Sequence, residues 1–122
     1  WEQFEQLRTS NVKFAQVAEG EDITEIAKSD EAFHDIIYYS TDNDKLILLL
    51  NQLREQMYRY RFVYIQEESR HDNLVAEHRE IYESIVSRDK ERASAAAKLH
   101  IDKQGKAIVR QIRMEKEGRK FI

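Results

Sequence analysis

The chain has 122 residues, of which 41% are hydrophobic and 35% are charged, and its formal net charge is -3 at pH 7. This length corresponds to one domain with a core of its own, and the slightly acidic balance argues against a nucleic-acid surface spread over the whole domain. The sequence contains no cysteine, which excludes disulfides and thiolate metal sites, and no apolar run approaches the ~20 residues of a membrane-spanning helix.

Helices are favoured throughout, because the sequence has no proline and only 3 glycines. Apolar residues recur at spacings of three and four, the period of an amphipathic helix. The pattern predicts an all-α fold, an antiparallel bundle of about five to six helices. The helices are expected at 1–19, 22–40, 44–66 and 72–87, with a last one from a cap at Asp89 to about residue 112.

Polar residues mark several of the helix boundaries. Asp22, with Glu25 three residues later, has the form of a capping box. The polar run 40–44 predicts a turn and the cap of the third helix. That helix has a long apolar stripe over 46–64 and is expected to be the backbone of the bundle. Gly105 lies inside the last helix, where it costs about 1 kcal/mol relative to alanine and indicates close packing or a bend.

An acid and an imidazole lie four residues apart in the second predicted helix, at Asp30 and His34. These two positions share one face of a helix, and Ile26, Phe33 and Ile37 turn that face towards the core. A buried carboxylate and imidazole need partners, and a metal ion would satisfy both. An ion pair that stabilises the helix is the alternative explanation of the same spacing.

Two further histidines have a similar helical context. His78 lies on the predicted apolar face of the fourth helix, and His100 follows the alanine run 95–97, where helices can approach closely. With the pair above, they would form a set of one carboxylate and three imidazoles from three helices, with positions left open on an octahedral ion. Such a set suits zinc, nickel, manganese or iron. A single histidine on an apolar face is more often a hydrogen-bonded core residue.

Several short motifs follow one another in a fixed order. They are Asp30-x-x-Phe33-His34, Asn43-x-x-Leu46, Glu77-His78-x-x-Ile81, Asp89 followed by alanines, and His100. This order, from about residue 22 to the C-terminus, resembles the C-terminal effector domain (FCD domain) of FadR-type regulators in the GntR superfamily of bacterial transcription factors.

The resemblance implies a ligand-sensing domain and not an enzyme, with a metal or effector cavity inside the bundle. In the metal-containing branch of that family, an Asp and three His hold one divalent ion, and the carboxylate of a small organic acid completes its coordination. Zinc is the first expectation for the ion, and nickel, manganese and iron are the alternatives. The ligand role carries over to Asp30, His34, His78 and His100.

Four other residues are expected to contact the effector. They are Arg54, Arg61, Tyr38 and Asn43, of which Asn43 also has the position of a helix cap.

The resemblance also implies partners and a place in a longer protein. Family members act as homodimers and bind DNA through an N-terminal winged helix-turn-helix, which these residues do not contain. Residues 1–122 are therefore expected to be one effector-binding domain cut from a longer chain, with the first helix of the bundle missing before Trp1. No membrane contact is expected, and the cytoplasm is the default location. Ser87 and Arg88 occupy a turn where family members often have a glycine.

Other classes of protein share parts of these patterns. The spacings Glu31-x-x-His34 and Glu68-x-x-His71 match those of di-iron carboxylate bundle enzymes, which also need two inward glutamates from other helices. The pair His71-Asp72 is reminiscent of metal-dependent phosphohydrolases of the His-Asp type, but without a convincing upstream histidine and downstream aspartate. A helical bundle with no site is the remaining alternative.

Overall fold

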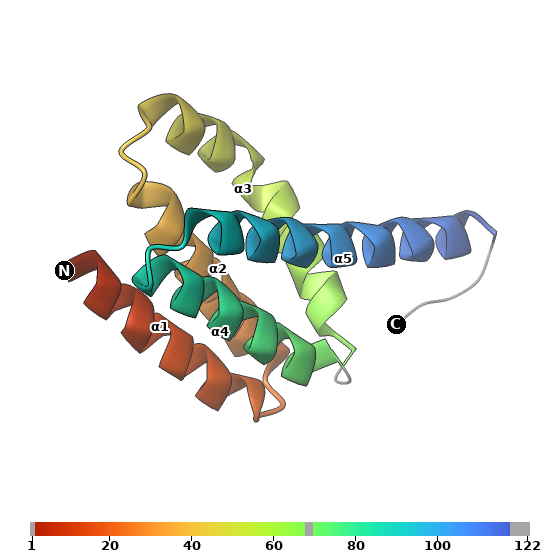
Figure 1. The fold of residues 1–122 in the computed structure, drawn as a ribbon. Coiled ribbons are helices and arrows are strands. Elements are labelled where there is room, and N and C mark those ends of the chain that lie inside the picture. The colour runs from red at the N-terminus through yellow and green to blue at the C-terminus, as the bar shows by residue number, and fades with distance from the viewer. Residues whose placement is uncertain (1, 68–69, 118–122) are drawn as a thin grey trace.

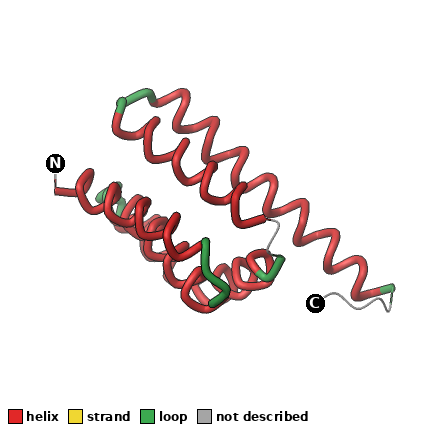
Figure 2. Tube along the Cα trace, turned by 90° about the horizontal axis from the view of Figure 1, so that it is seen from below, coloured by secondary structure: helices red, strands yellow, loops and turns green. Residues whose placement is uncertain are grey.

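The computed structural model describes residues 2–67 and 70–117, and within them it contains five α-helices and no strand (Figure 1). Within those ranges, short loops join successive helices, as Figure 2 shows from below. The predicted all-α class is confirmed, and so are the approximate positions of the helices. They are α1 (Glu2–Ala18), α2 (Ile23–Tyr39), α3 (Asp44–Ile65), α4 (His71–Val86) and α5 (Lys90–Lys116).

The predicted caps are present at the starts of α2, α3 and α5. The side chains of Asp22, Asn43 and Asp89 each accept a hydrogen bond from the backbone N–H three residues later, at 3.2, 3.1 and 3.0 Å. Each of these bonds satisfies a donor that the first turn of a helix would otherwise leave unpaired.

The turn between α4 and α5 contains a strained residue. Arg88 has a φ of 61°, in the left-handed region that favours glycine. This conformation ends α4, because it lets the N–H of Asp89 donate to the carbonyl of Ser84 at 3.1 Å. Ser87 and Arg88 form the turn in which the resemblance to FadR-type domains led us to expect a glycine.

The core lies among α1, α2 and α4, with a contribution from the second half of α3. Fully buried side chains come from all four helices, and α1 and α4 run side by side in front of α2 (Figure 1). The residues of this core without any exposed area are Phe14, Ile26, Ala27, Phe33, Ile65 and Leu74.

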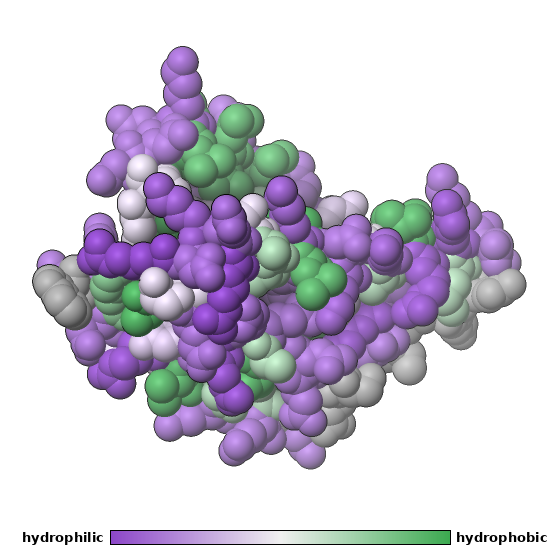
Figure 3. Space-filling view, in the orientation of Figure 1, coloured by the Kyte–Doolittle hydropathy of each residue, from purple (hydrophilic) through white to green (hydrophobic). Residues whose placement is uncertain are grey.

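The third helix is not the backbone of the bundle, so this expectation was wrong. Of α3 only Arg61, Tyr64 and Ile65 are buried, whereas Leu49 and Leu53 are 56% and 47% exposed. The first half of α3 extends away from the other helices, and hydrophobic side chains gather on the surface over it (Figure 3). Among the residues that the structure describes, none therefore covers the part of the apolar stripe that contains Leu49 and Leu53.

The second half of α5 also extends past the body of the domain (Figure 1). Val109 and Ile112, two apolar residues of this half, are 49% and 37% exposed. Gly105 does not mark close packing, because a Cβ added there would meet nothing within 4 Å. In the part of the chain that the structure describes, no helix is both long enough and apolar enough to cross a bilayer.

Candidate metal centre

The four predicted ligands lie together in the interior of the domain. Asp30 and His34 project from successive turns of α2, His78 comes from α4, and His100 comes from α5. One potential ligand atom from each of the four lies within 4.8 Å of the others, and all four side chains are buried. The structure thus brings together residues that are up to 70 positions apart in the sequence.

Short distances connect the members of this cluster. Asp30 Oδ1 lies 2.9 Å from His78 Nε2 and 3.3 Å from His34 Nε2. The Nε2 atoms of His34 and His100 are 3.3 Å apart. The His78 ring is fixed by two phenylalanines, because it stacks on Phe33 at a centroid distance of 4.3 Å and contacts Phe14 at 4.2 Å.

Several polar atoms in the cluster are buried without a hydrogen-bond partner. They include both carboxylate oxygens of Asp30 and both ring nitrogens of His78. His78 Nε2 lies close to Asp30 Oδ1, but the geometry of this contact is not that of a hydrogen bond. Leaving such atoms unpaired in a core costs about 1–3 kcal/mol each, so a bundle without a site does not explain them. A set of one carboxylate and three imidazoles, with lone pairs converging on one place, fits a divalent metal ion.

A second carboxylate orients His100. Its Nδ1 donates a hydrogen bond to Glu77 Oε1 at 2.6 Å, and Lys103 Nζ lies 3.6 Å from the other oxygen of Glu77. Because the proton is then on Nδ1, the Nε2 of His100 presents a lone pair to the cluster. The sequence carries no separate signal for this role, because Glu77 stands out there only as a member of the motif Glu77-His78-x-x-Ile81.

The protonation states of the cluster suit metal ligation. Burial lowers the pKa of His34 to about 4, and burial also lowers the pKa of His78, so both imidazoles are neutral near pH 7. Burial by itself would raise the pKa of Asp30, but the close electrostatic contacts with the His34 and His78 rings outweigh burial and hold that pKa well below its usual range. An ionised carboxylate and neutral imidazoles are the forms that bind metals.

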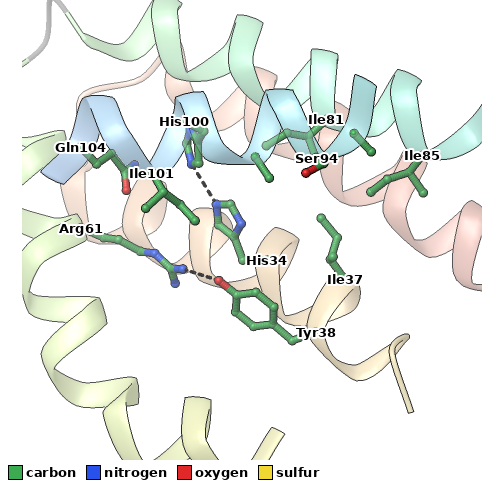
Figure 4. Close-up of a pocket in the computed structure, with 12 residues that line it drawn as sticks. His34, Ile37, Tyr38, Arg61, Ile81, Ile85, Ser94, His100, Ile101 and Gln104 are labelled. Carbon is green, nitrogen blue, oxygen red and sulfur yellow. Dashed lines mark hydrogen bonds between the residues drawn. The ribbon is translucent and has the colours of Figure 1, made fainter. Parts of the chain in front are cut away.

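A cavity of about 340 Å³ adjoins the cluster between α2, α3, α4 and α5 (Figure 4). His34 and His100 form part of its wall. Arg61 enters from α3, where its Nη2 donates to the Tyr38 hydroxyl at 3.2 Å and its Nε lies 3.6 Å from Asp30 Oδ2. Arg61 and Tyr38, two of the predicted effector contacts, therefore line the cavity.

The other two predicted effector contacts lie elsewhere. Arg54 donates to both oxygens of Asp35, at 2.9 and 3.0 Å, and its Nη1 is 3.4 Å from Glu31. Hydrogen bonding to Asp35 raises the pKa of the Arg54 guanidinium further above its usual value. Asn43 caps α3, and neither residue lines the 340 Å³ cavity.

The described residues that suggested a di-iron or His-Asp enzyme do not form a second metal site. His71 is buried on α4, but its Nε2 donates to the carbonyl of Ile65 at 2.7 Å, and Glu31 faces Arg54. Glu68 lies outside the described residues. Within 2–67 and 70–117, the four-residue cluster is the one group of histidine, aspartate or glutamate side chains arranged to hold an ion.

A family model described as the FCD domain matches residues 2–103. The chain belongs to the FCD family. FCD domains are the ligand-sensing regulatory domains of GntR-type regulators, so the resemblance seen in the sequence is confirmed. The match begins in α1, earlier than the motifs indicated, and it ends just after His100, so it includes the whole cluster. Searches among curated proteins and among solved structures found no match.

Proposed function

We propose that this FCD domain binds one divalent metal ion through Asp30, His34, His78 and His100, and that the ion takes part in sensing a small organic acid. The observation that carries the proposal is the set of converging, buried ligand atoms within 4.8 Å of one another, of which those of Asp30 and His78 have no hydrogen-bond partner. Zinc is the first candidate for the ion, with nickel, manganese and iron as alternatives, since the nitrogen and oxygen donors suit all of them.

The cavity supports an organic acid as the ligand. When bound, the ion would supply a positive charge and a coordination position for a carboxylate oxygen. Arg61 adds a permanent positive charge to the same wall, where its planar guanidinium suits a carboxylate. Tyr38 holds that guanidinium in place through its hydroxyl group.

The domain would act by regulation and not by catalysis. We infer that it works as a homodimer in the bacterial cytoplasm and that a winged helix-turn-helix outside these residues reads DNA, as in GntR-type regulators. Binding of the acid would shift the dimer between forms that differ in the spacing of their DNA readers. Membership of the FCD family supports this role.

A histidine substitution tests the metal site. His78→Ala removes one imidazole ligand, and we expect the purified domain to fall from about one bound ion per chain to near zero in elemental analysis by mass spectrometry. Because His78 fills space between two phenylalanines, His78→Gln serves as a second variant that retains side-chain volume. Circular dichroism of both variants should retain the helical signal.

His71→Gln is the matched control, since His71 is another buried histidine of α4 and lies outside the cluster. It should retain the ion. Full metal content in both His78 variants, or equal loss in the His71 control, would contradict the assignment of ligands.

A further inference from the structure

We propose that the cavity selects acids with a single carboxylate on a compact, branched apolar body, and that it discriminates against di- and tricarboxylates. The inference rests on the proposed function, because it takes acid binding at the metal cluster as given. The chemistry of the cavity walls then indicates which kind of organic acid fits.

The positive charge of the cavity is confined to one end. Arg61 is the cationic side chain of the lining, and its Nε lies 3.6 Å from the cluster residue Asp30. Tyr38 and His34 lie at the same end, and the view in Figure 4 places all three on one side of the cavity. A carboxylate bound there meets the metal cluster and the guanidinium together. One acid group therefore uses all of the positive charge that the described walls provide.

The opposite end is apolar. Ile37, Ile81 and Ile85 face the cavity away from Arg61, and Ser94 is the polar residue on that side (Figure 4). Ala93 and Ala97 of α5 also line the cavity. A second carboxylate at this end would lose part of its hydration without gaining a charged partner among the lining residues, which is unfavourable. An aliphatic group would instead remove apolar surface from water on both sides of the contact.

Two other arginines of the surrounding helices, Arg92 and Arg54, are already paired. Arg92 of α5 binds both oxygens of Glu80 at 2.7 Å, and it also lies 3.5 Å from Glu83. Arg54 of α3 binds Asp35, as described above. Recruiting either arginine to a second acid group would break an existing ion pair, so neither is a ready substitute for the missing charge.

The volume of the cavity limits the size of the apolar part of the ligand. The cavity of about 340 Å³ is roughly eleven times the ~30 Å³ that a water molecule occupies in the liquid, which corresponds to roughly ten non-hydrogen atoms of ligand. Short branched or monocyclic acids have this size. A hydroxyl group beside the carboxylate of the ligand would lie near Tyr38 and Gln104, which are neutral polar residues at the Arg61 end of the cavity.

An isosteric pair of acids tests the inference. 2-Hydroxyisocaproate and malate share the same hydroxy-acid head, but the first ends in an isopropyl group where the second ends in a carboxylate. With the zinc-loaded domain, calorimetric titration should give an affinity for 2-hydroxyisocaproate that is more than about tenfold higher than for malate. The neutral 2-hydroxyisocaproamide should bind far more weakly than the acid.

The outcomes separate the two levels of the proposal. Equal or tighter binding of malate would overturn the selectivity while leaving acid sensing intact. Binding of the amide as tightly as the acid, or failure of both acids and of citrate to bind, would instead overturn acid sensing at the cluster.

A charge placed at the apolar end provides the converse test. Ser94 lines the cavity and is exposed, so Ser94→Lys introduces a cation there without disturbing the core. The ratio of the two affinities should move towards malate by at least about tenfold. Ala95→Lys is the matched control, because this exposed neighbour carries the same charge on the same turn of α5 but does not line the cavity. An unchanged ratio in Ser94→Lys, or an equal shift in both variants, would contradict the inference.

Discussion

Glu77 sets which nitrogen of His100 faces the cluster. Its Oε1 accepts a hydrogen bond from His100 Nδ1 at 2.6 Å, and this leaves the Nε2 lone pair directed towards His34. Carboxylates in this position fix the ring orientation of a metal-binding histidine and increase its basicity. Lys103, 3.6 Å from the other oxygen, helps to hold Glu77 in place.

Glu77→Gln should weaken metal binding without removing any ligand. The amide can donate to His100 Nδ1 as well as accept from it, so the tautomer with a free Nε2 is no longer enforced. Removal of such a partner typically lowers metal affinity by about 10–100-fold. Competition with a chromophoric chelator would measure the change. Glu55→Gln, on an exposed site of α3, is the charge-matched control. Equal affinities in the two variants would rule out an orienting role for Glu77.

The sequence identified the ligand residues for reasons that differ between them. The pair Asp30 and His34 follows from helical spacing, since a separation of four places both side chains on one face. His78 and His100 were proposed from their order along the chain and from the resemblance to the FCD family. Glu77 had no signal of its own, because its partner lies 23 positions away on another helix and only the packing of α4 on α5 brings the two together.

At the level of the helices, the apolar periodicity predicted where the helices lie, but it did not predict which of their faces are buried. The stripe of α3 has the right spacing for a buried face, yet Leu49 and Leu53 are about half exposed. Spacing tells which side chains share a face but not whether another helix covers that face. The caps were predictable, because a capping side chain acts on its own neighbours within three residues.

Gly105→Ala should stabilise α5. The glycine lies within the helix, and an added Cβ has open space around it. The substitution removes backbone freedom from the unfolded chain, so the free energy of unfolding should rise by about 0.5–1 kcal/mol. Urea denaturation of the metal-free domain would measure the gain. A loss of stability instead would mean that the helix surface at this position is tightly covered in solution.

At the level of the whole molecule, the buried imidazoles make stability depend on pH. The folded domain lowers the pKa of His34 to about 4, from an ordinary value of 6.5. Between these two values the unfolded chain binds the proton and the folded chain does not, so acidification favours unfolding. His78 is shifted in the same direction. Above about pH 6.5 the two rings are neutral in both the folded and the unfolded chain, so they no longer make stability depend on pH.

The chelator-treated domain should therefore lose thermal stability steadily as the pH falls from about 6.5 to about 4. Thermal unfolding followed by circular dichroism at several pH values would record the trend. His34→Gln should flatten the slope, since glutamine does not titrate, and the His71→Gln control should retain it. A wild-type melting temperature that stays constant over this range would contradict the neutral, buried state of the cluster.

The attachment of α5 has a mechanical consequence. This helix has 27 residues, and beyond its buried contact at His100 the one further buried side chain in its described length is Gln111. The segment from His100 to Lys116 is roughly 24 Å long at 1.5 Å per residue, so a rotation of about 10° at His100 would displace its end by about 4 Å. The cavity touches α5 at His100 and on the turns to either side of it. A small rotation of α5 where it lines the cavity would thus produce a larger displacement at the end of the helix that extends beyond the bundle.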